Sequence, residues 1–470
     1  MPPDDPTLVV VSNREPYIHR SPDTVDQPVG GLTAAVDATM RETGGWWIAW
    51  GSGDADFVVA DEGVLGVPPT DPQYQLRRIP LDEPALEGYY YGYSNQVLWP
   101  LSHGLLDRVN VAPGFWERYR AVNETFATVV ADTIETVTSP LVWFQDYHLA
   151  LAPRLLREQL GQSPRLQQFW HIPWPAPDLF ARCPQAEQVL EGLLANDRLG
   201  FHVETYRQAF LSSVDRHLPA ATVEAAGDDP PRVVYDGTET RVYVSPIGVD
   251  TDAVRRLASD ESVRHEWDRL RSTNDIDTTE TVLVGVDRLD YTKGIGHRLR
   301  AFEHLLERRP ALHGTVRLIQ KGSRTRAAIP AYRRHYHRIR DRIDRINDRF
   351  GTDDWTPITY IEGSLSRQRL VALLAGADVG LVTAIADGFN LIALEYALAS
   401  ASPDELLISE FCGAASYLDG AVTINPHDVA GTAAAIGRAI DDTTVETDWP
   451  RLTDQARALD IDAWLADGLA

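Results

Sequence analysis

Two cations lie between a predicted strand and a predicted helix in the second half of the chain. Residues 282–286 form an apolar run typical of a buried parallel strand, and Arg288 and Lys293 follow it just before a helical pattern. Cations in this position can neutralise a diphosphate group. Lys293 is also one of only two lysines in the chain, the other being Lys321. The pattern therefore favours phosphate binding over a solvated pair of surface charges.

A second candidate is a loop nearer the C-terminus. The apolar run at residues 379–383 leads through this loop into a helical pattern that reaches residue 399. The loop consists of Asp387, Gly388, Phe389, Asn390 and Leu391. Its backbone amides would form the N-terminus of the helix, where anions bind. Glu395 lies one to two turns into that helix and could accept both hydroxyls of a ribose, the alternative being a glutamate on the helix surface.

Polar residues stand at the ends of three predicted strands in the first half. Arg14, Asp146 and His171 close the apolar runs that begin at residues 8, 141 and 168. A carboxylate at a strand end can orient a sugar hydroxyl, and the prolines after His171 fix the backbone that presents the imidazole. The alternatives are a surface ion pair for Arg14 and a structural role for the histidine.

Aromatic residues and a glycine pair add to the same part of the chain. Tyr90 and Trp99 could stack on the apolar face of a sugar, although an aromatic core cluster explains either ring equally well. Gly30 and Gly31 precede a helical pattern, where backbone amides can approach a phosphate or a sugar. Glycine is common in any loop between a strand and a helix, so this signal is weak alone.

Composition limits the possible functions. The 470 residues carry 68 acidic and 44 basic side chains, a net charge of −24, which disfavours general binding to nucleic acid or to anionic membranes. No apolar run approaches the ~18 residues of a membrane helix, and no secretory signal is visible. The two cysteines are expected to be free thiols in the cytoplasm. The acidic, lysine-poor composition is typical of proteins from salt-loving microbes, codon bias in a GC-rich genome being the alternative.

The order of the predicted elements indicates an α/β fold with two doubly wound parallel sheets. Two successive series of strand and helix patterns place a domain boundary near residue 250. We expect one domain over residues 1–250 and another over 251–450, with ligands in a cleft between the carboxyl ends of their strands. Residues 187–200 have helical rather than strand spacing. The terminal segment 451–470 is expected to include a helix that packs back on the first domain.

The chain resembles the trehalose-6-phosphate synthases, retaining glycosyltransferases of the GT-B architecture, in which two Rossmann-like domains face an interdomain cleft. The resemblance covers nearly the whole length and rests on these segments, which fall in family order: VVVSNR, GGL, YSNQVLWP, FQDYHL, FWHIPWP, LGFHVETYRQAFL, SPIGVD, VDRLDYTKGI, DVGLVTAIADGFNLIALEY and SEFCGAAS.

The resemblance implies a role for each candidate. The glucose-6-phosphate acceptor would be bound by Arg14, Tyr90, Trp99, Asp146 and Arg326. The nucleotide-glucose donor would be bound by Gly30, Gly31, Arg288, Lys293, Gly388, Phe389, Asn390, Leu391 and Glu395. The catalytic group would be Arg288, Lys293, His171 and Asp387. UDP-glucose is the expected donor, with GDP- and ADP-glucose left open, as is a homo-oligomeric state.

The resemblance also implies the reaction. The acceptor hydroxyl would attack the anomeric carbon on the face from which the diphosphate leaves, and fixed positive charge would stabilise the departing phosphate. No metal or other cofactor is expected, because the cations take that role. The alternatives are a related enzyme that glucosylates glycerol phosphate, a catalytically altered relative and a non-catalytic sugar-phosphate sensor.

Two positions depart from the family pattern. Gln145 stands where the family usually has a histidine, a change expected to adjust only the acceptor side. Leu394 stands where the family usually has a lysine, directly before Glu395. If that lysine contacted the donor, its loss would alter the preference for a nucleotide. The loop at residues 15–28 is also longer than the family pattern leads us to expect.

Overall fold

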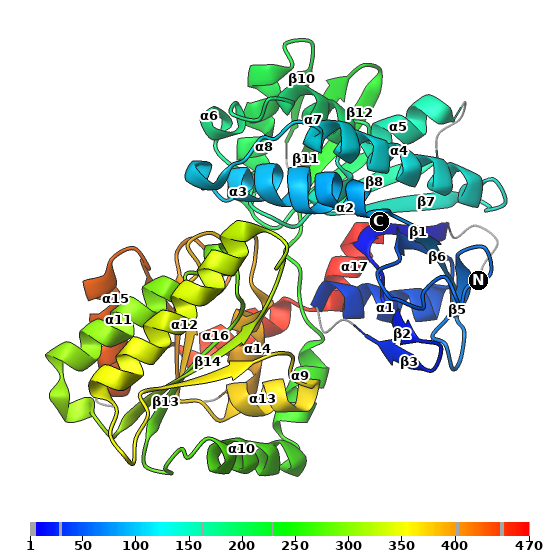
Figure 1. Ribbon diagram of the computed structural model, residues 1–470. Coiled ribbons are helices and arrows are strands. Elements are labelled where there is room, and N and C mark those ends of the chain that lie inside the picture. The colour runs from blue at the N-terminus through cyan, green and yellow to red at the C-terminus, as the bar shows by residue number, and fades with distance from the viewer. Residues whose placement is uncertain are drawn as a thin grey trace. The chain divides into compact units, whose positions relative to one another are not determined.

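The computed structural model describes residues 6–27, 31–160, 164–227, 229–400, 404–441 and 446–469 (Figure 1). The chain divides into two compact units, of which unit 1 comprises residues 1–246 and 465–470 and unit 2 comprises residues 247–464. Each unit is built around its own parallel sheet, and each is described separately below.

Unit 1 contains one large sheet and a small hairpin in its described part. The sheet has the order β10-β11-β12-β9-β8-β7-β1-β4-β6-β5, in which the seven central strands from β12 to β6 run parallel. The strand bounds are β1 (Thr7–Arg14), β2 (Ile18–Ser21), β3 (Thr24–Asp26), β4 (Trp46–Trp50), β5 (Val64–Val67), β6 (Tyr74–Ile79), β7 (Pro140–Gln145), β8 (Arg165–Trp170), β9 (Arg198–Phe201), β10 (Thr222–Ala226), β11 (Asp229–Tyr235) and β12 (Thr238–Val244).

Helices cover both faces of this sheet. Figure 1 shows α1 and the end of α17 on one side, and α4, α5 and α7 on the other. The bounds are α1 (Gly31–Thr43), α2 (Glu83–Leu86), α3 (Trp99–Ser102), α4 (Phe115–Ile134), α5 (Ala152–Gln159), α6 (Pro177–Phe180), α7 (Ala186–Leu193) and α8 (Glu204–His217). A π-helix, η1 (Glu87–Leu98), joins α2 to α3. The strands are therefore enclosed, which explains why β1 is a continuous apolar run and not an alternating one.

Unit 2 has one parallel sheet in its described residues, with the order β15-β14-β13-β16-β17-β18. The bounds are β13 (Thr281–Arg288), β14 (Val316–Ser323), β15 (Ile358–Glu362), β16 (Val379–Val382), β17 (Glu405–Ser409) and β18 (Val422–Ile424). In chain order this is the doubly wound arrangement 3-2-1-4-5-6. The central parallel strands of unit 1 follow the same order with one strand added. The prediction of two doubly wound α/β sheets is confirmed.

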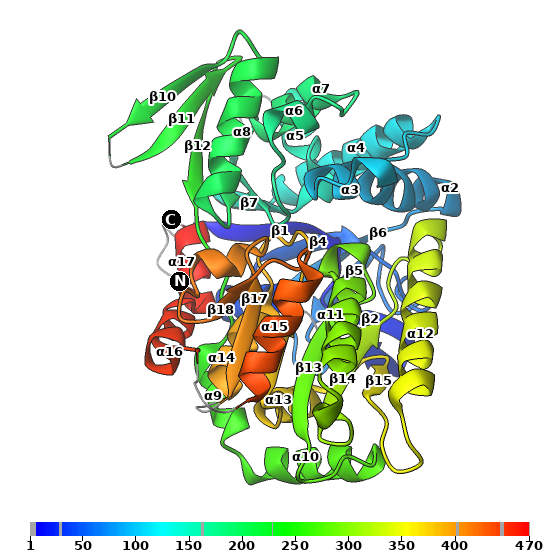
Figure 2. The same cartoon turned by 90° about the vertical axis from the view of Figure 1, so that its left-hand side faces the viewer.

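Two groups of helices enclose the second sheet. Helices α11, α12 and α15 form one group, and α9, α10, α13, α14 and α16 form the other (Figure 2). The bounds are α9 (Thr251–Ala258), α10 (Glu261–Thr273), α11 (Ile295–Arg308), α12 (Pro330–Phe350), α13 (Arg367–Ala375), α14 (Leu391–Ala399), α15 (Val429–Ile440), α16 (Trp449–Ala458) and α17 (Ile461–Leu469). Leu299, Phe302 and Ile343 belong to the buried core beneath the first group.

The sequence predicted most parallel strands but not all of them. It assigned no strand to β4, β5, β6, β10 or β11, and its helical prediction for residues 187–200 was wrong at the end. Helix α7 stops at Leu193, and the short strand β9 begins at Arg198. Four residues are too few to show a period, so β9 is recognisable only by its pairing with β8 and β12.

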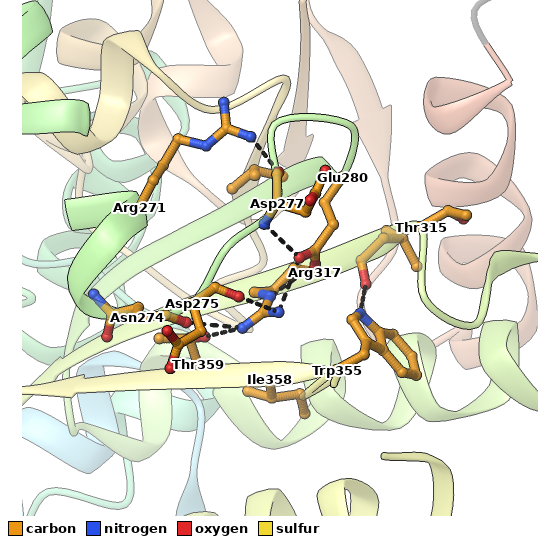
Figure 3. Close-up of polar contacts among 12 residues, drawn as sticks. Arg271, Asn274, Asp275, Asp277, Glu280, Thr315, Arg317, Trp355, Ile358 and Thr359 are labelled. Carbon is orange, nitrogen blue, oxygen red and sulfur yellow. Dashed lines mark hydrogen bonds and ion pairs between the residues drawn. The ribbon is translucent and has the colours of Figure 1, made fainter. Parts of the chain in front are cut away.

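The amino ends of β13 and β14 are joined by a buried ion pair between Glu280 and Arg317 (Figure 3). The guanidinium of Arg317 on β14 donates two hydrogen bonds to Glu280, at 2.8 and 2.9 Å. It also donates to the backbone carbonyls of Asn274 and Asp275, at 3.1 and 3.0 Å. Both charged side chains are almost fully buried. This network lies at the opposite edge of the sheet from the candidate site residues, so we interpret it as structural.

The last helix begins in unit 2 and ends in unit 1. The backbone carbonyls of Asp467 and Gly468 accept hydrogen bonds from Arg198 and Gln167 of the first sheet. Cys183 and Cys412 are both buried free thiols. Within the described ranges, no helix is both long enough and apolar enough to cross a membrane.

Candidate active site

The candidate residues of unit 1 gather at one edge of its sheet. Because the central strands are parallel, their carboxyl ends meet at the same edge, and ligands of such sheets bind where the strand order reverses. In unit 1 the order reverses between β1 and β7. Arg14 is the last residue of β1, Asp146 directly follows β7, and His171 directly follows β8. The fold thus places all three at or beside the reversal point.

Arg14 contacts Tyr90 directly. Its guanidinium donates a hydrogen bond of 3.1 Å to the Tyr90 hydroxyl. The Arg14 side chain is exposed, whereas Tyr90 is buried and its ring is stacked on His148 at 5.8 Å. The ring of Trp50, at the end of β4, lies 5.9 Å from the ring of Tyr90. An exposed cation held by a fixed phenol is suited to binding the anionic group of a ligand.

Behind Arg14, the next residue turns inward. The carboxyl of Glu15 faces the guanidinium of Arg78 at 2.7 Å and accepts a hydrogen bond of 2.7 Å from the backbone of Ser52. Arg78 also contacts Asp56, at 3.2 Å, and neither of these side chains is exposed. Burial, together with neighbouring Asp56, raises the pKa of Glu15 to about 8. The network ties the loop after β1 to the loop after β4 and so fixes the backbone that carries Arg14.

The π-helix supplies the aromatic residues. The Asn95 side chain donates to the Tyr90 carbonyl at 2.7 Å and accepts from the Tyr147 hydroxyl at 2.8 Å. Trp99 follows on α3 and lies 5.8 Å from the ring of Tyr147. π-Helices are rare and are frequently found at functional sites. Both predicted aromatic residues are therefore buried neighbours of the loop that carries Asp146.

Asp146 adopts a backbone conformation that is unusual for any residue except glycine, with φ +70° and ψ 177°. Such a conformation costs about 1–3 kcal/mol and persists only where neighbouring contacts enforce it. Here the Asp146 amide donates to the Phe169 carbonyl at 2.7 Å, and Gln168 donates to the Asp146 carbonyl at 2.9 Å. In this conformation the carboxylate of Asp146 is partly exposed and lies 3.8 Å from Nδ1 of His148.

His171 lies beside the same carboxylate. Its backbone amide donates to Asp146 at 3.4 Å, and its Nε2 lies 2.9 Å from Gln145 Oε1. Burial, and secondarily His202, holds the pKa of His171 well below its ordinary value. A neutral imidazole in this position can form hydrogen bonds with a sugar but adds no positive charge to the site.

In unit 2, Lys293 pairs with Asp387 across the reversal point of the sheet, which lies between β13 and β16. The Lys293 ammonium is 2.5 Å from Asp387 Oδ2, and the same oxygen accepts a hydrogen bond of 2.9 Å from Asn390. Gly294, with φ +66°, starts α11 immediately after the lysine. A Cβ at this glycine would lie 1.8 Å from the Thr383 carbonyl, so the two loops approach too closely for any other residue.

Arg288 ends β13 with an exposed side chain. The preceding residue, Asp287, is buried and bonds to Arg298 at 2.8 Å. Burial raises the pKa of Asp287, while Arg298 and Lys293 oppose that rise. The contact between Asp287 and Arg298 fixes the end of the strand, and the exposed side chain of Arg288 lies at the edge of the predicted phosphate site.

The loop that contains Asp387 leads directly into the N-terminus of α14. Asn390 has φ +83° and precedes Leu391, the first residue of the helix. Phe389 is buried, and its carbonyl accepts hydrogen bonds from Cys412 and Ala414. These contacts hold the loop in place, so that the first backbone amides of the helix stay available to an anion.

Arg326 is engaged inside unit 2. Its guanidinium bonds to Asp290 at 3.0 Å and to the Tyr332 hydroxyl at 2.6 Å, and all three side chains are buried. The remaining acceptor candidates belong to unit 1. Asp290 caps the short turn that carries Lys293, so Arg326 supports the loop of the predicted phosphate site.

One predicted site residue lies outside the described ranges, and two residues of the site were missed by the sequence prediction. Gly30 lies outside the described residues, and Gly31 is the first residue of α1. The sequence prediction missed His148, although that histidine contacts both Tyr90 and Asp146. It also missed Arg367, whose guanidinium bonds to Glu395. The motif around Asp146 contained the signal for His148, but nothing in the sequence pointed to Arg367.

Comparison with known proteins gives a consistent result. The family model described as Glycosyltransferase family 20 matches residues 6–469. A trehalose-6-phosphate synthase of Enterobacter sp. (strain 638) is 35% identical over 435 residues, which are 92% of this chain and 87% of that protein.

Solved structures are similar over almost the entire chain. The α,α-trehalose-phosphate synthase (UDP-forming) of Burkholderia xenovorans, in complex with glucose-6-phosphate, has a TM-score of 0.87 and 31% identity and covers 98% of this chain and 99% of its own. A trehalose-6-phosphate synthase studied with bisubstrate glycomimetics, as a case of glycosyltransfer with retention, has a TM-score of 0.84 and 30% identity, with 98% of both chains covered.

Proposed function

The chain belongs to glycosyltransferase family 20, and from this premise we propose that it transfers glucose from UDP-glucose to glucose-6-phosphate, giving trehalose-6-phosphate and UDP with retention of configuration. The identity of about one third to trehalose-6-phosphate synthases, over more than nine-tenths of the chain, carries this proposal. The two doubly wound sheets are those of the GT-B fold of its structural neighbours. The protein is thus an enzyme, and its substrates follow from the reaction of its relatives.

The acceptor is assigned to the edge of unit 1. Arg14 would bind the phosphate of glucose-6-phosphate, because its guanidinium is exposed and is held by Tyr90. The carboxylate of Asp146 would accept a hydrogen bond from a sugar hydroxyl. Trp99 and Tyr90 would line the apolar face of the ring. Arg326 would add a further contact to this phosphate, and its ion pair with the buried Asp290 also holds the Lys293 loop.

The donor is assigned to the edge of unit 2. Arg288 and Lys293 would contact the diphosphate, and the N-terminal amides of α14 would add favourable dipoles. Glu395 would accept hydrogen bonds from the ribose. Asp387 bonds to Lys293 and to Asn390, and both Asp387 and Asn390 would contact the transferred glucose.

In the reaction, the bond between the anomeric carbon of glucose and the diphosphate oxygen breaks, and its electron pair leaves with UDP. The acceptor hydroxyl forms the new bond on the same face, and its proton passes to the departing phosphate. Positive charge fixed near that phosphate stabilises the transition state more than the ground state, which is the source of the rate enhancement.

The experiment is to incubate the purified protein with each candidate pair of substrates and to weigh the products. UDP-, GDP- and ADP-glucose are each offered with glucose-6-phosphate and, separately, with glycerol 3-phosphate. We expect a disaccharide phosphate from UDP-glucose and glucose-6-phosphate. Formation of a glucosylglycerol phosphate instead would assign the alternative acceptor, and release of no nucleotide from any pair would indicate a sensor.

A further inference from the structure

Glu395 is held by a residue that is distant in sequence. Arg367, the first residue of α13, donates a hydrogen bond through Nη1 to Glu395 Oε1 on α14. Glu395 is buried, with 5% of its surface exposed, whereas the Arg367 side chain is 42% exposed. The guanidinium therefore reaches from the surface to a carboxylate inside the unit and fixes one of its two oxygens.

The second oxygen of the Glu395 carboxylate accepts no hydrogen bond from the described residues. Glu395 Oε2 is buried and has no hydrogen-bond partner among the described residues. An ionised carboxylate can accept about four hydrogen bonds, and a buried acceptor without a partner costs free energy. A ligand with hydroxyl groups, such as a ribose, could supply the missing hydrogen-bond donor to this oxygen.

Leu394, the neighbour of Glu395 on α14, supplies no positive charge to the carboxylate, and the cation comes instead from Arg367 on α13. Its side chain is fully buried in unit 2, so position 394 contributes to core packing and supplies no charge. Among the described residues, Arg367 is the cation that forms an ion pair with Glu395. Burial raises the pKa of Glu395, and Arg367 opposes that rise. The arginine therefore favours the ionised form of the carboxyl and also fixes its orientation.

We propose that Arg367 is a positioning residue for the donor nucleotide: it binds Oε1 of Glu395 and so presents Oε2 to the ribose hydroxyls. This inference rests on one part of the proposed function, namely that the donor is a nucleoside diphosphate sugar. Arg367 itself makes no contact with the reacting atoms, and it acts entirely through Glu395.

Arg369 provides a matched control on the same helix. It lies two residues from Arg367, has a side chain that is 43% exposed, and forms an ion pair with a glutamate of another helix, Glu266 on α10, at 2.9 Å. Replacing either arginine removes one partly exposed ion pair of α13. A difference between the two variants therefore reports what Arg367 does for Glu395 and not a general weakening of the helix.

The first measurement is the binding of UDP by titration calorimetry, with steady-state kinetics beside it. For Arg367→Ala we expect the Kd of UDP and the KM of UDP-glucose to rise at least tenfold, while the KM of glucose-6-phosphate stays unchanged. Arg367→Lys should recover part of the loss, since an ammonium can still pair with Oε1. Arg369→Ala should bind UDP like the parent protein, and the melting temperatures of all variants show whether they are folded.

The second measurement asks whether the loss acts through the ribose. The affinities of UDP and of 2′,3′-dideoxyuridine diphosphate are compared in the parent and in Arg367→Ala. We expect the penalty of the substitution to disappear with the dideoxy nucleotide, which lacks the hydroxyls that Glu395 would bind. An equal penalty for both nucleotides, or an equal effect of Arg369→Ala, would overturn the proposal.

These outcomes are separate from those of the proposed function. Nucleotide binding is measured without an acceptor and without turnover, so it reports on Arg367 even if glucose-6-phosphate proves to be the wrong acceptor. GDP and ADP carry the same ribose, so the comparison is run with whichever nucleoside diphosphate the parent protein binds most tightly. If the parent protein bound none of the three, the proposal would be wrong.

Discussion

The ammonium of Lys293 lies 2.5 Å from a carboxylate oxygen of Asp387, and this contact joins the loop after β13 to the loop after β16. The two side chains are 13% and 12% exposed, so the pair is largely shielded from water. It stands where the strand order of the second sheet reverses, the position at which doubly wound sheets bind their ligands. One of the only two lysines in the chain is thus held at the point where the diphosphate of the donor is proposed to bind.

Replacing Lys293 should therefore remove activity without unfolding the protein. For Lys293→Ala we expect kcat to fall about a hundredfold or more, since one preorganised charge at a developing anion contributes ~3 kcal/mol. Lys321→Ala is the control, because that lysine bonds to Ser323 and is not part of the proposed site. Arg288→Ala should resemble Lys293→Ala. Near-normal turnover by both variants of the proposed diphosphate pair would refute their assignment.

Arg14 is expected to determine the affinity for the phosphorylated acceptor. Its hydrogen bond to Tyr90 is external to the sheet, so Arg14→Ala should fold normally. Loss of a charge-assisted contact costs about 1.5–3 kcal/mol, which corresponds to a rise of ten- to a hundredfold in the KM of glucose-6-phosphate. The KM of UDP-glucose should stay unchanged, and Arg20→Ala, which breaks an exposed pair with Asp26, should alter neither. Unchanged saturation by glucose-6-phosphate would place the acceptor elsewhere.

Arg326 is a poorer test of the same site. The sequence motif suggested that it and Arg14 would behave alike, but Arg326 neutralises the fully buried Asp290. Removing one partner of a buried pair destabilises a protein by about 3–5 kcal/mol. The loss of activity in Arg326→Ala would therefore combine misplacement of the Lys293 loop with partial unfolding.

The buried network behind Arg14 should make stability depend on pH. Burial raises the pKa of Glu15 to about 8, so the folded protein keeps a proton that the unfolded chain has already released. Glu15 therefore makes its full contribution to the free energy of unfolding below the ordinary pKa of glutamate. This contribution is lost as the pH rises toward about 8. We expect Glu15→Gln to flatten the dependence of the melting temperature on pH between 5 and 8.

Glu239→Gln serves as the control for that experiment, because Glu239 forms an exposed pair with Arg232 and lies in the same unit. It should leave the pH dependence of the parent protein unchanged. A slope in Glu15→Gln identical to that of the parent would show that Glu15 is ionised throughout this range.

The ion pair of Arg317 and Glu280 is expected to contribute to stability and not to catalysis. Both side chains are almost completely buried, so Arg317→Ala leaves a carboxylate without its partner and should cost about 3–5 kcal/mol of unfolding free energy. Arg324→Ala breaks the exposed pair with Glu362, which water and salt screen, so it should leave the unfolding free energy close to that of the parent protein. Urea titrations measure both. At 25 °C the folded Arg317 variant should keep the parent kcat, and a selective loss of kcat would contradict the structural interpretation.

The sequence predicted those parts of the fold and the site that depend on neighbours along the chain. The apolar run of β13, the cations after it and the glycine that begins α11 lie within a few residues, so their pattern already indicated a strand, a charged loop and a helix. The same holds for the loop at Asp387 and the start of α14. The class of the fold followed from the repetition of such units.

What the sequence could not show are contacts between distant segments. Glu15 and Arg78 are 63 residues apart, and Arg367 and Glu395 are 28 apart, and no local pattern marks either pair. His148 was visible in its motif, but its stacking on Tyr90 depends on the path of the π-helix. The sequence shows Leu394 only as a missing charge, whereas its complete burial shows that this position belongs to the core.

The most direct test of the account is to follow the reaction of UDP-glucose with glucose-6-phosphate by proton NMR. The proposed function requires equal amounts of UDP and of a disaccharide phosphate, with both anomeric protons showing the small coupling of an α linkage. Release of UDP without a disaccharide, or a product with a β-configured glucose, would contradict retention and the assignment of the acceptor together.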